Sequence, residues 1–308
     1  MLENTFHEQS YKNHEQGFTE YARGGKMATV AQSWFNENTL NYIGIKERNE
    51  IINPLLKAYQ ESQWLTVGDG RYGSDAAYIQ SKGFDVTATD ISDILLKEGL
   101  ELGIISKYKK ENSENLSFSN NEFDFALCKE AYHHFPRPMK ALYEMLRVSK
   151  QGIVLLEPVD QYIYSNFIQM LFRKSLHLMN FLGLFKLLTG TKLKRHTYED
   201  VGNYVYKLSV REVEKVALGL NYPTIAYKKM NTIYLKGMEN TPANKFTLLK
   251  LKTKLITLTL NTLSTISIME PALMSFIIFK NKPTPEALIQ LKAANYRVIN
   301  LPQNPYIK

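Results

Sequence analysis

A glycine turn between an apolar run and a helical pattern is the feature that most constrains the fold of this chain. Residues 64–67 read Trp-Leu-Thr-Val, the turn carries glycines at 68, 70 and 73, and a helical pattern follows over 74–83. A second apolar run, residues 84–89, ends at Asp90 before another helical pattern. Two such units in succession predict parallel strands joined by helices.

The same alternation continues along the chain. Residues 123–128 form an apolar run before a helical pattern around 139–148, and the aliphatic run 153–156 reads as a strand buried on both faces. Strands that alternate with helices over residues 60–160 predict an α/β fold with a doubly wound, mostly parallel sheet. We expect two late strands, within 224–235 and 273–280.

The glycine turn and the acid after the second strand also carry chemistry. Gly68, Gly70 and Gly73 allow a ligand to approach the backbone closely, and the Asp90 carboxylate can accept both hydroxyl protons of a ribose. The pattern predicts a site for an adenosine-containing cofactor, either a nicotinamide dinucleotide or S-adenosylmethionine. Asp69 in the turn favours S-adenosylmethionine, since a carboxylate there would repel a pyrophosphate, unless its side chain points to solvent.

Three segments together resemble a known family. They read WLTVGDGRYGSDA (64–76), VTATDIS (86–92) and ENLSFSNNEFDFALCKEAYHHFPRPMKALYEMLRVSKQGIVLLEP (114–158). They are similar to class I S-adenosylmethionine-dependent methyltransferases of the small-molecule type, with a type-11-like methyltransferase domain, a group that includes quinone-biosynthesis enzymes. The resemblance spans about residues 62–160. It implies a Rossmann-like methyltransferase fold with a seven-stranded sheet, N-terminal helices and an α-helical lid or insert.

The resemblance also implies a set of cofactor-binding residues. S-adenosyl-L-methionine would be the methyl donor and S-adenosyl-L-homocysteine the product. The methionine part would lie at the turn 68–73, the ribose at Asp90 with Ile91 beside it, and the adenine at the segment Asn112, Ser113 and Glu114. We also count Lys129, at the end of the third apolar run, among the cofactor-binding candidates.

The chain departs from the family pattern at three positions. Thr66 stands where the family usually has an acid, and Asn112 stands where an aspartate is common. Gln151 replaces the usual proline in the turn before the fifth strand. The first two departures bear on the contacts to the methionine and adenine parts of the cofactor.

The catalytic candidates follow the third apolar run. Glu130, His133 and His134 come directly after it, where a doubly wound sheet opens toward its ligand. Methyl transfer depends mainly on positioning, and a hydroxyl acceptor also benefits from a base that removes its proton. Either histidine has a pKa suited to that role, or the two have a structural role at the helix start.

A polar and aromatic segment, residues 198–206, is the candidate acceptor contact. It could bind a ring-shaped polar acceptor such as a sugar, or be an ordinary connection with exposed tyrosines. The basic residues of 192–195 could meet a phosphate or carboxylate of the acceptor, or form a solvated turn. The acceptor is therefore expected to be a small molecule, with an anionic, glycan or lipid-linked one among the options.

The chain divides into five expected regions. They are a helical lead-in (1–60), a cofactor-binding core (61–160), a helical lid or substrate region (161–222), terminal strands with a helical insert (223–282) and a surface tail (283–308). The apolar part of the third region, 162–191, fits a pair of packed helices, a lid over the substrate, or an interfacial membrane helix.

Composition narrows the function classes. The chain has 308 residues and a formal charge of +8, which shows only short clusters along the sequence. One cysteine, Cys128, and six histidines have no zinc-binding spacing, so we expect no metal, and Cys128 reads as a core residue. We expect no secretory signal or transmembrane segment, a cytoplasmic location with peripheral membrane contact allowed, and no nucleic acid partner.

The function expected from the sequence is methyl transfer to a small molecule, for example to an oxygen of a sugar or glycolipid precursor, or to a quinone. Two alternatives stay open at this stage. The glycine turn alone permits an NAD(P)-dependent oxidoreductase. Thr66, at the usual acid position, leaves open a noncatalytic S-adenosylmethionine-binding protein.

Overall fold

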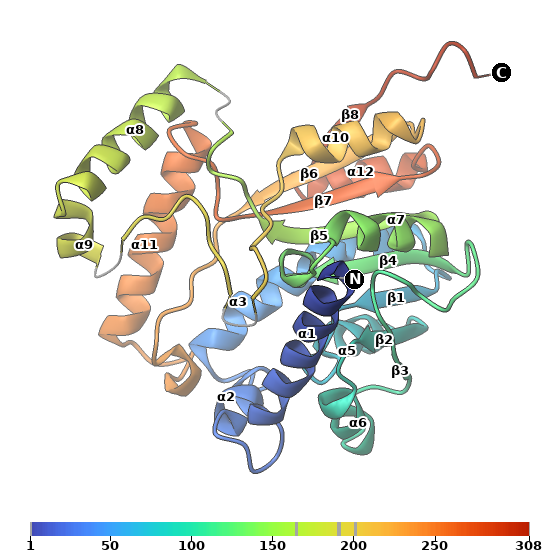
Figure 1. Ribbon diagram of the computed structural model, residues 1–308, viewed down its shortest axis with the longest axis horizontal. Coiled ribbons are helices and arrows are strands. Elements are labelled where there is room, and N and C mark those ends of the chain that lie inside the picture. Colours follow the sequence, from blue (N-terminus) through green and yellow to red (C-terminus); the bar gives the residue numbers. More distant parts are fainter. Residues whose placement is uncertain (1, 164–165, 190–191, 200–201, 308) are drawn as a thin grey trace.

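The computed structural model describes residues 2–163, 166–189, 192–199 and 202–307. Its centre is one sheet with helices on both faces (Figure 1). The strand order is β3-β2-β1-β4-β5-β7-β6-β8, and the five strands β1 to β5 run parallel. β7 is antiparallel to both of its neighbours, and β8 is antiparallel to β6. The predicted doubly wound α/β fold is confirmed, but with eight strands rather than the expected seven.

The bounds of the strands are β1 Trp64–Val67, β2 Val86–Asp90, β3 Tyr108–Lys110, β4 Phe123–Lys129, β5 Ser149–Pro158, β6 Thr224–Met230, β7 Leu273–Phe279 and β8 Arg297–Asn300. The α-helices are α1 Leu2–Gly17, α2 Ala28–Ser33, α3 Leu40–Asn49, α4 Asn53–Ala58, α5 Ser74–Ser81, α6 Ile94–Glu101, α7 Pro138–Val148, α8 Phe167–Phe181, α9 Leu184–Thr189, α10 Val210–Gly219, α11 Leu248–Thr265 and α12 Pro285–Ala293. Four short 3-10 helices are η1 Phe18–Glu20, η2 Glu50–Ile52, η3 Tyr132–His134 and η4 Met238–Asn240.

Two hydrophobic layers hold the helices on the sheet. Successive side chains of a strand point to opposite faces, so Ile153 and Leu155 of β5 pack with α7 and α10 on one face. Val154 and Leu156 pack with α4, α5 and α12 on the other. Because both faces are covered, every residue of β1 and of β7 is buried. This explains why these strands appear in the sequence as largely apolar runs, each with one buried hydroxyl residue, Thr66 in β1 and Ser275 in β7.

The C-terminal segment differs from the surface tail expected after residue 282. It begins with α12, which the Thr284 side chain caps by accepting a hydrogen bond from Ala287 N at 3.1 Å. β8 then adds the eighth strand to the edge of the sheet beside β6. The buried Tyr296 hydroxyl donates to the carbonyl of Ile51 at 2.9 Å, which ties this segment to the N-terminal helices. Strand β8 is short and half-exposed, so it lacks the apolar run by which the other strands were recognised.

Candidate functional site

A cavity of about 460 Å³ lies at the carboxyl ends of β1, β2 and β4. The chain runs from β1 outward to β3 in one direction and from β4 to β5 in the other, so the strand order reverses between β1 and β4. Doubly wound sheets bind ligands at such a reversal. The cavity volume is within the range that holds a small molecule or a cofactor.

The glycine turn forms one wall of the cavity. Gly68 has a φ of +77°, and a side chain there would place Cβ 2.4 Å from Cβ of Ala131. A Cβ on Gly70 would lie 2.5 Å from the ring of Phe18 and 2.8 Å from the Asp90 carboxylate. Gly68 therefore requires glycine, whereas a side chain at Gly70 would displace the Phe18 ring or the Asp90 carboxylate. Gly73 does not line the cavity; it starts helix α5 with a φ of +69°.

The Asp69 side chain is turned toward the start of α5. Its carboxylate accepts hydrogen bonds from the backbone N–H groups of Asp75 at 3.1 Å and Ala76 at 2.9 Å. It also accepts one from the Thr66 hydroxyl at 2.9 Å. Burial, together with the nearby Asp75, raises the pKa of Asp69. Asp69 lines the cavity, as predicted, but its carboxylate accepts these three hydrogen bonds and points neither to solvent nor freely into the cavity, so it does not distinguish a dinucleotide from S-adenosylmethionine. The Thr66 hydroxyl fits this partner, whereas an acid there would face a second carboxylate.

Asp90 ends β2 with its carboxylate on the cavity wall, next to Ile91. It accepts a hydrogen bond from Ser92 N at 2.9 Å. Burial raises the pKa of Asp90 to about 7, although the N–H groups of Ser92, Gly70 and Ile91 partly oppose the shift. A buried carboxyl group held by backbone donors at a cavity wall is suited to accept hydroxyl groups of a ligand.

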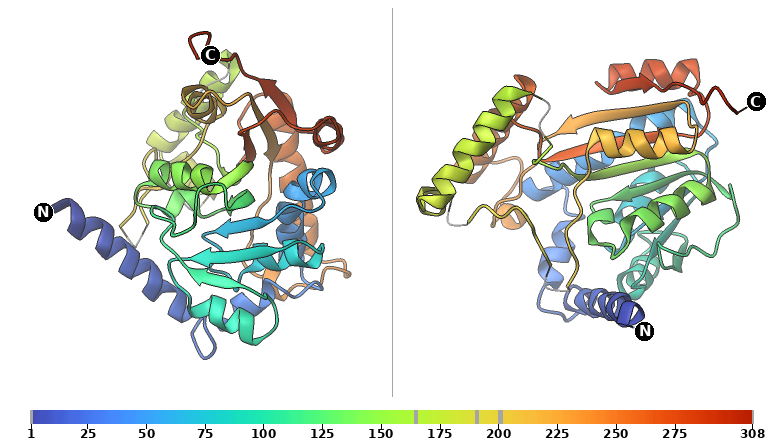
Figure 2. Two further views of the ribbon diagram at one scale, coloured as in Figure 1. Left: turned by 90° about the vertical axis from the view of Figure 1, so that its right-hand side faces the viewer. Right: turned by 45° about the horizontal axis from the view of Figure 1, so that its top comes forward.

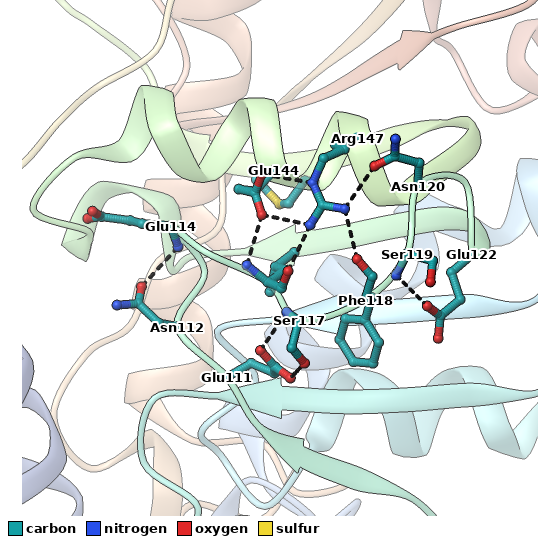
Figure 3. A network of polar contacts seen from close by, with 12 residues as sticks. Glu111, Asn112, Glu114, Ser117, Phe118, Ser119, Asn120, Glu122, Glu144 and Arg147 are labelled. Carbon is teal, nitrogen blue, oxygen red and sulfur yellow. Dashed lines mark hydrogen bonds and ion pairs between the residues drawn. The ribbon is translucent and has the colours of Figure 1, made fainter.

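The loop that carries Asn112 and Ser113 to the cavity is fixed by a polar network (Figure 3). The Asn112 side chain accepts a hydrogen bond from Glu114 N at 2.9 Å, which forms a local turn. Arg147 of α7 donates to the carbonyl oxygens of Leu116 at 2.7 Å and Phe118 at 2.8 Å. Arg147, more than thirty residues from Asn112 in the sequence, therefore holds the loop in place. Asn112 and Ser113 thus keep a defined position at the cavity wall.

Lys129 and Glu130 also line the cavity, and each forms an ion pair with a residue of opposite charge. Lys129 forms an ion pair with the buried Asp75. Glu130, with a φ of +52°, forms an ion pair with Arg48 at 2.9 Å. Burial by itself would raise the pKa of Glu130, but Arg48 and Arg71 outweigh it and hold that pKa below its usual value. A carboxylate that stays ionised in an ion pair is a weak base.

The structure separates the two predicted histidines. His133 does not line the cavity, and its Nδ1 lies 2.5 Å from the fully buried Glu157, which also accepts hydrogen bonds from two backbone N–H groups of the same turn. Burial lowers the pKa of His133, but Glu157 outweighs this effect and the net shift is upward. His134 does line the cavity, and its Nδ1 lies 2.5 Å from Oε1 of Glu199.

Side chains from the N-terminal region complete the cavity. They are Tyr11, His14, Phe18, Tyr21, Trp34, Ile45 and Arg48. Helix α1 is docked by Asn203, which donates to Nε2 of His14 at 2.8 Å and accepts from the Ser10 hydroxyl at 2.6 Å. The sequence predicts this region only as a helical lead-in, without a place in the site. The available signal was its mixture of aromatic and polar residues, which is unlike a purely apolar packing face.

The region expected to act as a lid contributes one described side chain, Glu199, to this cavity. Within 198–206, Asn203 docks α1, while Asp200 and Val201 lie outside the described residues. Lys192, Lys194 and Arg195 are exposed and away from the cavity wall. Cys128 is fully buried in the core, and burial raises the pKa of its thiol. Among the described residues, no cluster of His, Cys, Asp and Glu could hold a metal ion.

Comparison with known proteins confirms the predicted resemblance for the central part of the chain. A sequence model of the methyltransferase domain family matches residues 65–156. This segment therefore matches a methyltransferase domain, over less than half of the chain. It holds β1, β2 and β4, which form the cavity, together with the glycine turn and Asp90.

Individual relatives match more narrowly. The chain is 34% identical over 95 residues to the 2-methyl-6-phytyl-1,4-hydroquinone methyltransferase of Synechocystis sp., and this match spans only about 30% of the length of either protein. Among solved structures, the YcgJ protein from Bacillus subtilis has a TM-score of 0.47 at 17% identity, covering 77% of this chain and 99% of its own. A SAM-dependent methyltransferase from Methanosarcina mazei has a TM-score of 0.43 at 18% identity, covering 73% of this chain and 95% of its own.

Proposed function

We propose that this protein is an S-adenosylmethionine-dependent methyltransferase that acts on a hydroxylated small molecule. The observation that carries the proposal is the glycine turn and the buried Asp90 carboxylate on the walls of one cavity within a methyltransferase domain. The residues around the cavity fit such a cofactor. Gly68 and Gly70 line the cavity with backbone alone, and the ionised Glu130 suits a ligand with positive charge on sulfur and nitrogen.

Each part of the cofactor then has a proposed partner. Asp90 would accept the ribose hydroxyls, with Ile91 beside the ring, and the backbone of 68–70 would face the methionine part. Asn112 and Ser113, held by the network of Figure 3, would meet the adenine. Lys129 would compensate the negative charge of Asp75 at the same cavity wall through their ion pair.

The bound cofactor supplies an electrophilic methyl group, and the protein supplies position and a base. The methyl carbon would move from sulfur to an acceptor oxygen, the carbon–sulfur bond electrons would stay on sulfur, and the hydroxyl proton would go to His134. Glu199, which faces Nδ1 of His134, would orient the ring and stabilise its protonated form. Glu130 is less suited because its ion pair with Arg48 keeps it ionised, and His133 lies behind the cavity wall on Glu157.

The rings of the cavity wall support an acceptor with a planar or apolar part. Tyr11, Phe18, Tyr21, Trp34 and Phe135 gather there. Sugar and glycolipid hydroxyls and hydroquinones are the acceptor classes that we propose to test. A hydroquinone is included because the curated relative from Synechocystis is named for one.

Cofactor identity is the first prediction. Calorimetric titration of the purified protein should show micromolar binding of S-adenosylhomocysteine and S-adenosylmethionine and no binding of NADH. Binding of NADH alone would overturn the proposal in favour of an oxidoreductase. Methyl transfer from labelled S-adenosylmethionine to a panel of sugars, glycolipids and hydroquinones then separates an enzyme from a noncatalytic binding protein.

The pH dependence of cofactor binding is the second prediction. The pKa of Asp90 in the free protein is raised to about 7, and ribose hydroxyls bind best to the ionised carboxylate. Below that pH, binding must displace a proton, so the Kd of S-adenosylhomocysteine should rise by up to about tenfold per pH unit between about pH 7 and 6. Calorimetry across this range should show the rise in the unmodified protein and a flat profile in Asp90→Asn.

A further inference from the structure

Three helices project together to one side of the sheet. They are α8, α9 and α11, seen beside the sheet in Figure 1 and from two other directions in Figure 2. The described residues of two segments far apart in the sequence, 161–198 (without 164–165 and 190–191) and 244–269, make up this part, which we call the basic lobe. Asn166 at the start of α8 donates to the carbonyl of Ser267 beyond the end of α11 at 3.1 Å, which joins the segments.

The basic lobe carries the whole net charge of the protein. Ten of the 38 Lys and Arg residues lie in its two segments and none of the 30 Asp and Glu residues does. The rest of the chain has 28 basic and 30 acidic residues, so it is nearly neutral. Along the sequence the charge shows only short clusters. It becomes one strongly basic region because the fold brings two separated segments together.

These basic side chains are available to an external partner. Eight of the ten are exposed; Arg173 and Lys250 are half-buried. Among the described residues, none of the ten forms an ion pair with a carboxylate. Arg173 and Arg195 instead lie over the ring of Tyr162, at 4.5 and 5.5 Å from its centre. The lobe therefore presents positive charge that the protein does not itself neutralise.

Helix α8 has its apolar residues on the side exposed to solvent. Phe167, Leu171, Leu178 and Phe181 recur at helical spacing and are all exposed, Phe181 to 85%. The fully buried residue of the helix is polar, Gln169. A helix that packs only within its own protein shows the reverse arrangement.

Helix α11 shows the same arrangement. Leu248, Leu251, Leu255 and Leu258 are exposed, Leu248 to 80%, while its one buried residue is Ser264. Two of its threonines bond within the helix. The hydroxyls of Thr259 and Thr262 each donate to a backbone carbonyl four residues earlier at 2.9 Å, which lowers the cost of removing these hydroxyl groups from water.

We propose that the basic lobe docks on the surface of a lipid bilayer that contains anionic lipids. Exposed Phe and Leu side chains with Lys and Arg around them are the composition that binds the headgroup and acyl-chain boundary. No described helix is long and apolar enough to span a bilayer, so the helices would lie on the membrane. A second copy of the chain does not suit this surface, because a dimer formed through the lobe would bring two strongly basic surfaces together, and they would repel each other. A nucleic acid would leave the apolar stripes without a partner.

The lobe is connected directly to the cavity, although the inference does not rest on the proposed function. Residues 192–199 run from the exposed Lys192 of the lobe to Glu199 on the cavity wall. Docking would therefore hold the cavity near the membrane surface. Because the residues of the lobe do not line the cavity, membrane binding and methyl transfer can be tested separately.

Cosedimentation with vesicles tests the inference. The full chain should bind vesicles of phosphatidylcholine with phosphatidylglycerol at least about tenfold more tightly than vesicles of phosphatidylcholine alone, and salt should weaken this binding. The pairs Phe167→Ser with Phe181→Ser and Lys252→Glu with Lys254→Glu should each reduce binding by at least about tenfold. A matched pair outside the lobe, Ile289→Ser with Lys292→Glu on α12, should bind as the unmodified protein does.

Two results would overturn the inference. One is binding that the serine pair leaves unchanged, because it would show adsorption by charge alone. The other is a dimer in sedimentation velocity that the serine pair dissociates, with no vesicle binding, which would make the lobe an interface between copies. Thermal unfolding and S-adenosylhomocysteine titration of each variant verify that the rest of the fold is intact.

Discussion

Replacement of Asp90 by alanine should weaken the binding of S-adenosylhomocysteine by at least about tenfold, a loss of about 1.4 kcal/mol or more. The carboxylate is the acceptor for two ribose hydroxyls in the proposed complex, and hydrogen bonds to charged groups are among the stronger ones. Calorimetric titration at a pH above about 7.5, where Asp90 is mainly ionised, measures the effect.

Loss of stability would not explain such a result. Burial raises the pKa of Asp90 to about 7, so its ionised form is unfavourable in the free protein at neutral pH, and its removal takes away that penalty. Asp85→Ala is the matched control, because it lies just before the other end of β2 and pairs on the surface with Lys107. If Asp90→Ala bound S-adenosylhomocysteine with unchanged affinity, Asp90 would not be a cofactor-binding residue.

The part of the site that could be predicted from the sequence is the part built from one continuous segment. A strand that leads into a glycine turn, and a second strand that ends at an acid, place Gly68, Gly70 and Asp90 at one sheet edge by geometry alone. Lys129, at the end of the predicted strand 123–128, also reaches the cavity, whereas Asn112 was implied only by the family resemblance because the short strand β3 before it has no apolar run. In each case the position of the residue at the end of a strand, or just after it, determines where it lies.

The remaining residues could not be predicted because distant contacts decide their places. Arg48 lies at the cavity in an ion pair with Glu130, and His14 lies there bonded to Asn203, and neither pair has a local sequence pattern. The orientation of the Asp69 carboxylate depends on which hydrogen-bond donors of the folded chain lie close to it. Three of them, at the start of α5 and on Thr66, surround it, so the carboxylate turned inward.

The two adjacent histidines also could not be assigned different roles from the sequence alone. His133 and His134 are adjacent and follow the same strand, so sequence reasoning could not rank them. Buried Glu157 of β5 fixes the first in the protein interior, while Glu199, from the segment after α9, faces the second on the cavity wall. The proposed roles of the two therefore differ, and kinetics can distinguish them.

Substitution of His134 by glutamine should lower kcat for a hydroxyl acceptor by about 10²- to 10⁴-fold, with the affinity for S-adenosylhomocysteine nearly unchanged. Glutamine keeps a polar side chain at the cavity wall but cannot take up the proton. Burial raises the pKa of Glu199, but the facing His134 outweighs this and lowers it, so Glu199 is the ionised partner of the ring. Glu199→Gln should therefore give a smaller loss of kcat and shift the acidic limb of the rate profile to lower pH, because the imidazolium loses its counter-charge and the neutral base persists to lower pH.

His133→Gln is the matched control for this measurement. It breaks the contact with Glu157, so it should lower the unfolding temperature, whereas the acidic limb of the kcat profile should remain where it is in the unmodified protein. A loss of kcat in His133→Gln equal to that in His134→Gln would show that the turn acts as one unit and that His134 has no separate role as base. Full activity of His134→Gln would mean that the acceptor reacts without loss of a proton to this residue, as expected for a nucleophile that is already ionised.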